Sequence, residues 1–74
     1  MDKEKYLIAK KNGKLEKLRS DEISRRFFAK YPLTEQVFIL MDKDKNPDKY
    51  NACQEFRAKC EEEVDKEIAE LENT

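Results

Sequence analysis

Apolar residues recur every three or four positions between residues 46 and 71, and no other stretch of the chain is as regular. The stripe consists of Cys53, Phe56, Cys60, Val64, Ile68 and Leu71. Its five steps span 18 residues, or 3.6 per turn, which is typical of a straight α-helix rather than of a coiled coil with a period of about 3.5. Asn46 is a suitable N-cap, and Pro47 suits the first helical position. The pattern predicts one long helix over about 47–72, which forms the spine of the core.

The N-terminal pattern is typical of a β-hairpin instead. Residues 5–11 and 14–19 each read as a strand, and they flank Asn12-Gly13, a dipeptide that favours the tight turns of hairpins. A helix across the second segment is the alternative, but its apolar residues do not keep to one helical face. We therefore predict a hairpin over about 5–19.

Two shorter helices are expected between the hairpin and the long helix. Residues 21–30 form the first, which Pro32 terminates. The second covers about 34–45, although residues 37–41 are also compatible with a buried strand. The prediction is a single α+β domain over residues 1–74. It consists of an N-terminal β-hairpin followed by three helices, the last long and packed as an αα-hairpin with the preceding one.

Charge divides the chain into two halves. Charged residues make up 45% of the 74 residues, and the net charge is −1. Residues 1–30 carry ten Lys/Arg and five Asp/Glu, whereas residues 31–74 carry six and twelve. The basic first half and the acidic second half are therefore both candidates for contacts with charged partners.

The expected setting is the cytoplasm. Cys53 and Cys60 lie seven positions apart on one helix, which separates their Cα atoms by roughly 10 Å and makes a disulfide between them unfavourable. Free thiols suit a reducing compartment. The charged N-terminus is unlike a signal peptide, and the longest apolar run of five residues is too short to cross a bilayer.

No set of residues indicates an enzyme, a metal site or a cofactor site. The chain has no histidine to act as a base or a zinc ligand, and its single glycine excludes a glycine-rich phosphate loop. Residues 42–46 begin like a calcium loop, but Pro47 then stands where such loops need glycine. We expect a non-enzymatic protein without a cofactor or a metal.

The leading hypothesis is a protein that binds another macromolecule. A 26-residue helix spans about 39 Å, whereas a compact domain of this length measures roughly 29 Å across. The C-terminal end should therefore project and expose its apolar line to another protein or to a second copy, as a homodimer. The partner-binding candidates are Val64, Ile68, Leu71, Glu61, Glu62 and Asp65.

The alternative is a nucleic-acid-binding module that uses the basic N-terminal half. Lysines around a hairpin tip can contact phosphates, and a two-stranded ribbon can enter a major groove. The candidate residues are Lys10, Lys11, Lys14, Lys17, Arg25 and Arg26.

From residue 31 onward the sequence resembles a kind of small phage-encoded protein of unknown role. The resemblance depends on residues 31–36, 37–41 and 46–52, followed by Phe56 and Cys60. It implies a bacteriophage or mobile-element source and a helical hairpin, and it carries no catalytic residues. With this resemblance, the expected function is that of a phage accessory or counter-defence (inhibitor) protein. A virion or assembly component is a further alternative.

Overall fold

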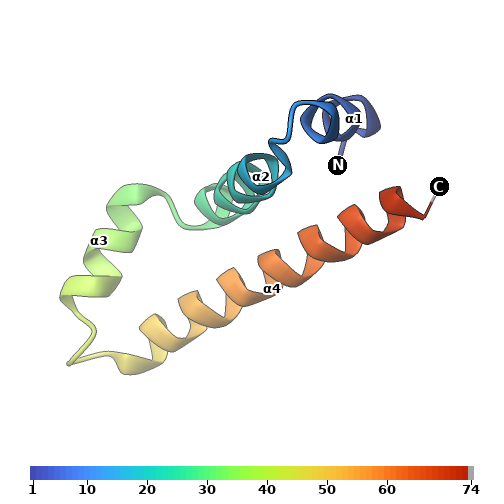
Figure 1. The fold of residues 1–74 in the computed structure, drawn as a ribbon. Helices are drawn as coiled ribbons and strands as arrows, with labels where there is room; N and C mark the ends of the chain where they lie inside the picture. The colour runs from blue at the N-terminus through green and yellow to red at the C-terminus, as the bar shows by residue number, and fades with distance from the viewer. Residues whose placement is uncertain (74) are drawn as a thin grey trace.

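A computed structural model describes residues 1–73, and within this range four α-helices joined by short turns make up the fold, without a strand. Its elements are α1 (Lys3–Lys11), α2 (Leu15–Lys30), α3 (Leu33–Met41) and α4 (Pro47–Glu72). In Figure 1, α2 lies alongside α4, α1 lies near the C-terminal end of α4, and α3 lies at the opposite end. The described chain is a rod of 46 × 19 × 16 Å. The predicted α+β class is therefore wrong, and the fold is all-α.

The Asn12-Gly13 dipeptide makes a turn, but this turn ends a helix instead of joining two strands. Gly13 has a φ of +67°, in the left-handed region that glycine adopts without strain. The Lys14 N–H donates to the Ala9 carbonyl at 2.7 Å, and the Gly13 N–H donates to the Lys10 carbonyl at 3.3 Å. This pair of bonds is a Schellman motif, the common C-terminal stop of an α-helix. The predicted hairpin over residues 5–19 is accordingly absent.

Helix α1 occupies the segment that was expected to form the first strand. The Asp2 carboxylate accepts a hydrogen bond from the Glu4 N–H at 3.0 Å and caps the helix. Tyr6 and Ala9, three positions apart, are the buried residues of α1. The helical period therefore describes this segment better than strand alternation does.

Helix α2 joins the expected second strand and the expected helix over 21–30 into one element. Its buried residues are Ile23 and Phe27, while Glu22 and Arg26 are half-buried beside them. Because Glu22 and Arg26 occupy core-facing positions, the apolar residues of this segment do not by themselves form the stripe by which a helix is recognised in a sequence. The helix ends at Lys30, just before Tyr31-Pro32, as expected.

Helix α3 ends earlier than predicted, and the connection to α4 is correspondingly longer. Helix α3 ends at Met41, and residues 42–46 form a turn instead of continuing the helix to residue 45. The Asn46 N–H donates to the Asp42 carbonyl at 2.7 Å, and the Asn46 side-chain amide donates to the Asp42 carboxylate at 2.8 Å. The alternative of a buried strand at 37–41 is excluded, because these residues are helical.

Helix α4 runs from Pro47 to Glu72 with Asn46 as its N-cap, which confirms the predicted long helix. Its principal partner is α2, whereas α3 contacts it less extensively. The expected αα-hairpin between α3 and α4 is therefore not the main packing of the fold. Because α1 and α2 cover the second half of α4, that half does not project from a compact domain.

The core consists of two apolar clusters along the interface between α2 and α4. The first contains Ile23, Cys60 and Val64, with Met1, Phe56 and Ile68 packed against it. The second contains Phe27, Ile39 and Cys53, with Tyr31, Tyr50 and Phe56 packed against it. Phe56 joins the two clusters, and its ring centroid lies 6.3 Å from that of Phe27 and 5.6 Å from that of Tyr31.

Candidate protein-binding surface

Helix α3 exposes most of its apolar residues to solvent. Ile39 is its only buried residue, and the Gln36 side chain on the same side donates to the Tyr31 carbonyl at 2.7 Å. The other large apolar side chains form what we call the α3 surface. They are Leu33 (68% exposed), Val37 (47%), Phe38 (67%), Leu40 (62%) and Met41 (78%).

These five side chains form one continuous surface. At 100° per residue, they fall in the order Leu40, Leu33, Val37, Met41, Phe38 within an arc of about 160°. Leu33, Val37 and Leu40 also follow the i, i+4, i+7 spacing by which a helix inserts its apolar face into a partner's groove. The helix therefore has its broad apolar face on the solvent side.

An apolar groove lies beside the α3 surface. Its volume is about 240 Å³. Leu33, Val37 and Leu40 line its α3 side, and Tyr50 and Cys53 belong to its α4 side. The groove thus extends the apolar area of the α3 surface toward α4.

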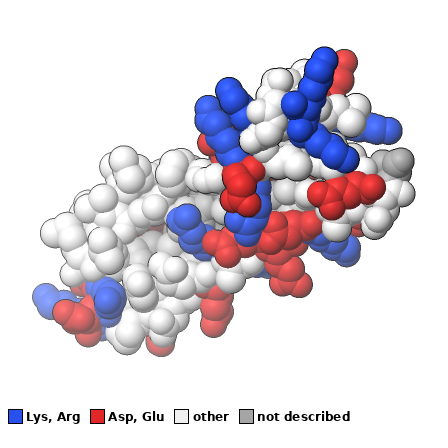
Figure 2. Space-filling view, viewed as in Figure 1, with Lys and Arg blue, Asp and Glu red and all other residues white. Residues whose placement is uncertain are grey.

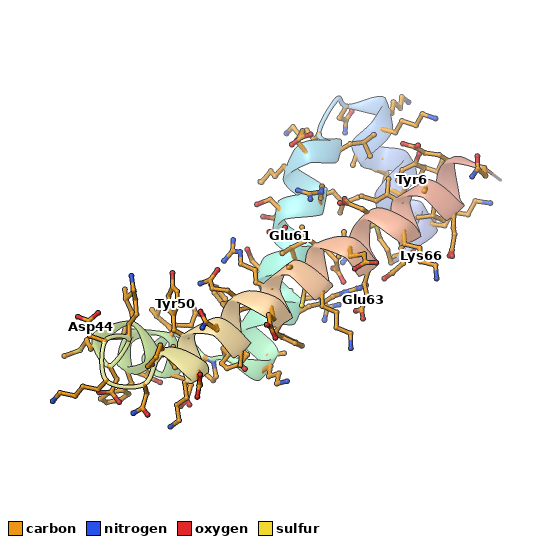
Figure 3. The ribbon with its side chains drawn as sticks, turned by 90° about the horizontal axis from the view of Figure 1, so that it is seen from below. Tyr6, Asp44, Tyr50, Glu61, Glu63 and Lys66 are labelled. Carbon is orange, nitrogen blue, oxygen red and sulfur yellow. The ribbon has the colours of Figure 1, made fainter. Side chains whose placement is uncertain are left out.

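The space-filling view shows the same division (Figure 2). Over α3 the visible surface is mostly uncharged, with a group of basic and acidic side chains at the tip beyond it, whereas many more Lys, Arg, Asp and Glu side chains lie over α1, α2 and the second half of α4. Tyr6 of α1 and Asp44 of the turn before α4 mark the two opposite ends (Figure 3). Apolar and charged surfaces are thus separated along the length of the rod.

The predicted partner-binding residues Val64, Ile68 and Leu71 lie on α4 as expected, but they are less exposed than predicted. The Val64 side chain is fully buried in the first core cluster, with a relative exposure of 0%. Ile68 packs against this cluster, and Leu71 is half-buried. The apolar line of α4 is therefore largely covered by other parts of the chain itself.

The acidic candidates of α4 are partly engaged within the chain. Asp65 accepts from Arg19 of α2, with distances of 2.5 Å from Nε to Oδ1 and 3.1 Å from Nη2 to Oδ2. Glu61 lies 3.7 Å from Arg57, one turn away on α4. Glu62 is exposed. The Arg19 hydrogen bonds lower the pKa of Asp65 below its ordinary value.

A second ion-pair network joins α2, α4 and the N-terminus. Glu67 accepts from Arg26 Nη1 and Nη2 at 2.6 and 2.8 Å and from the Met1 amine at 2.6 Å. Arg26 and Arg25 both donate to Glu22. The Arg26 hydrogen bonds, followed by that of the amine, lower the pKa of Glu67 to about 2. Arg25 and Arg26, predicted to contact nucleic acid, thus form ion pairs within the chain.

The lysines of the predicted nucleic-acid site behave differently from the arginines. Lys10, Lys11, Lys14 and Lys17 are all exposed, and they form no salt bridge among the residues that the structure describes. They lie around the junction of α1 and α2, where Lys14 and Lys17 line a groove of about 250 Å³. Lysines predominate at this junction, and Asp21 is the acidic residue of the same groove.

The cysteines contribute to packing. Cys53 and Cys60 are both buried free thiols, each in one of the two core clusters. Burial raises the pKa of each thiol and so disfavours the nucleophilic thiolate. Within residues 1–73, no group of three or more His, Cys, Asp or Glu side chains is arranged to hold a metal ion. No described helix is both long and apolar enough to span a membrane.

The sequence interpretation missed the α3 surface, although the pattern contained a signal for it. Residues 37–41 are five consecutive apolar residues, and Leu33 lies one turn before them. Once such a run is helical, its side chains point in all directions, so they cannot all face one core. A short helix at the end of a small domain that carries such an apolar run therefore indicates an exposed apolar surface.

Comparison with known proteins finds no protein family, no curated protein and no solved structure that matches this chain.

Proposed function

We propose that this chain is a small non-enzymatic protein that binds another protein, and that the α3 surface is its binding site. The observation that carries the proposal is the exposure of five large apolar side chains on a single nine-residue helix. Scattered exposed apolar residues are normal, but a contiguous group of this size is typical of an interaction site. Removing it from water would supply the main driving force for binding.

Its shape supports a protein partner rather than a small molecule. The α3 surface is convex, and the adjoining groove of about 240 Å³ is smaller than typical small-molecule sites of about 300–1,000 Å³. A row of side chains spaced i, i+4, i+7 beside a shallow groove suits another helix or a groove on another chain.

Its charge supports a protein rather than a lipid surface. Helices that bind membranes through one face usually carry lysines and arginines on the other face. Helix α3 has Glu35 as its charged residue and no basic residue, and the turn that follows it alternates acidic and basic side chains. No electrostatic attraction to anionic lipids would therefore assist α3.

A phage source would suit such a function, because small phage accessory and counter-defence proteins can act by binding a host protein. The support for this part of the proposal is the resemblance of residues 31–74 to a small phage-encoded protein. The α3 surface lies within that range.

The test compares two double variants with matched chemistry. Val37→Ser with Leu40→Ser removes two central side chains of the α3 surface, and Leu7→Ser with Ile8→Ser removes two exposed apolar side chains of α1. Each immobilised chain is incubated with an extract of the source organism, and the retained proteins are quantified by mass spectrometry. The native chain and the α1 variant should retain the same specific protein, and the α3 variant should retain at least about tenfold less of it.

Equal retention by the α3 variant would show that the surface is not the binding site. An untagged copy of the chain is added to the extract, so that binding to a second copy would also be detected. If the immobilised native chain then retains no protein above the level of empty beads, the proposed function as a whole is refuted. Circular dichroism of the three chains would establish that each is folded.

Nucleic-acid binding is a second candidate function, and the basic junction of α1 and α2 favours it. Lys10, Lys11, Lys14 and Lys17 are exposed and form no salt bridge among the described residues, so they are available to phosphates. The affinity of such binding falls steeply as the salt concentration rises, and the slope of this dependence is set by the number of phosphates that the protein contacts.

The corresponding test is a salt titration of DNA and RNA binding. Lys11→Gln with Lys14→Gln should reduce the affinity and the salt slope, whereas Lys43→Gln with Lys45→Gln, at the opposite end, should change neither. Absence of binding at low salt would eliminate this candidate.

A further inference from the structure

We infer that the partner of the α3 surface is a second copy of this chain, and that two copies pair α3 against α3 as a homodimer. The inference rests on the proposed function, because it names the protein that the same surface binds. The dimer contact is thus assigned to α3 and not to the C-terminal part of α4, because Val64 of α4 is already fully buried within the chain.

The available apolar area matches what a stable dimer needs. The exposed fractions of the α3 surface correspond to roughly 640 Å² when a large apolar residue exposes about 200 Å². A standard specific interface buries about 800 Å² on each partner, and about 1,200–2,000 Å² in total. Two α3 surfaces would therefore bury roughly 1,300 Å² in total, which lies within this range at its lower end.

The distribution of charge allows the α3 surface to pair with itself. In a twofold-symmetric dimer the same patch occurs on both sides, so residues near the axis meet their own copies. A charged patch would place like charges together, which is unfavourable. The arc from Leu40 through Val37 to Phe38 contains no charged side chain, because Glu35 lies outside it. The basic α1–α2 junction and the acidic part of α4 do not meet this condition.

The shape is self-complementary as well. Each copy has a projecting row of side chains directly beside the groove between α3 and α4. A twofold axis next to Val37 would let Phe38 or Met41 of each copy approach the groove of the other. Each copy then supplies both the inserted side chain and the receiving groove, as an isologous interface requires.

The inferred dimer has a distinctive overall shape. Because α3 lies at one end of a rod 46 Å long, pairing through α3 leaves the two charged halves far apart (Figures 1 and 2). The dimer should be elongated, with a radius of gyration well above the 14.9 Å of the Cα atoms of one chain.

The experiment is sedimentation equilibrium with charge substitutions at Val37. The native chain should show a reversible monomer–dimer equilibrium, and small-angle X-ray scattering of the dimer should show an elongated particle. Val37→Glu and Val37→Lys should each weaken dimerisation at least about tenfold, because each would place like charges together at the axis. An equimolar mixture of the two variants should form a heterodimer, because the opposite charges then meet at the axis. Unfolded chains could not pair in this way, so the heterodimer would show that both variants are folded.

Ile8→Glu is the matched control, since Ile8 is an exposed apolar residue on α1 (60% exposed), far from α3. This variant should dimerise like the native chain. A native chain that stays monomeric up to millimolar concentration would overturn the inference, as would a Val37→Glu chain that dimerises normally. If the native chain is monomeric but the Val37→Ser with Leu40→Ser variant loses a retained protein, the proposed function stands and only the second copy is excluded.

Discussion

Arg26 of α2 donates through both Nη atoms to the Glu67 carboxylate of α4, 41 positions later in the sequence. The two distances are 2.6 and 2.8 Å, and both side chains are less than one-third exposed. A paired geometry of this kind is both stronger and more specific than a single ion contact. It holds the C-terminal half of α4 against α2, next to the first core cluster.

Removing the Glu67 charge should lower the stability of the fold. Glu67→Gln leaves Arg26 with Glu22 as its other acceptor and leaves the Met1 amine without its partner. We expect the free energy of unfolding to fall by about 1–3 kcal/mol, as for hydrogen bonds to charged groups. Urea denaturation measures the change. Glu70→Gln, which removes an exposed carboxylate from the same helix, should change it by less than about 0.5 kcal/mol. Equal effects of the two variants would contradict a specific role for Glu67.

Acid should weaken the same network. The hydrogen bonds from Arg26 lower the pKa of Glu67 from an ordinary 4.5 to about 2. The stabilisation is therefore fully present above about pH 4.5 and is lost as the pH falls toward 2, because the unfolded chain takes up its proton first. Urea denaturation of the native chain and of Glu67→Gln at several pH values should show their stability difference shrinking across this range. A difference that does not depend on pH would be inconsistent with the lowered pKa.

Core and surface isoleucines should differ sharply in their contribution to stability. Ile23 is 4% exposed and packs with Cys60 and Val64, so Ile23→Ala should cost about 2–5 kcal/mol. Ile8 is 60% exposed, and Ile8→Ala should change the stability by less than about 0.5 kcal/mol. Thermal and urea unfolding would measure both. Similar losses for the two variants would show that α1 is packed more deeply than the structure shows.

Removal of the Tyr6 hydroxyl should not weaken the fold. Tyr6 is 2% exposed, and its hydroxyl is buried without a hydrogen-bond partner among the described residues. A buried polar group without a partner costs about 1–3 kcal/mol, so Tyr6→Phe should leave the stability unchanged or raise it by about 1 kcal/mol. Tyr50→Phe, at a half-buried site, is the control. A clear loss of stability in Tyr6→Phe would indicate that this hydroxyl is bonded in solution.

The long helix was predictable because its signals agree. Asn46 and Pro47 start α4 as they start many helices, and an unbroken apolar stripe follows. The N-terminal half gave conflicting signals. An Asn-Gly pair suits a hairpin turn and a helix C-terminus equally well, and only the bonds from Lys14 and Gly13 back into α1 distinguish them.

The burial of Val64 was not predictable from helix length. A spherical domain would leave the end of α4 projecting, but this chain is a rod 46 Å long, which exceeds the length of about 39 Å of α4 itself. Half-buried charged residues make that shape possible, because Arg26 and Glu22 occupy core-facing positions of α2 that an apolar pattern cannot show. For the same reason the sequence could not show that Arg25 and Arg26 have internal acceptors.

The separation of the two surfaces has a consequence for how such a chain can change over generations. The ion pairs and the first core cluster lie in one half of the rod, whereas the α3 surface lies in the other half. Substitutions among Leu33, Val37, Phe38, Leu40 and Met41 should therefore alter what the chain recognises while costing little folding free energy. A lineage could exchange one partner for another at this end by single steps, with each intermediate still folded.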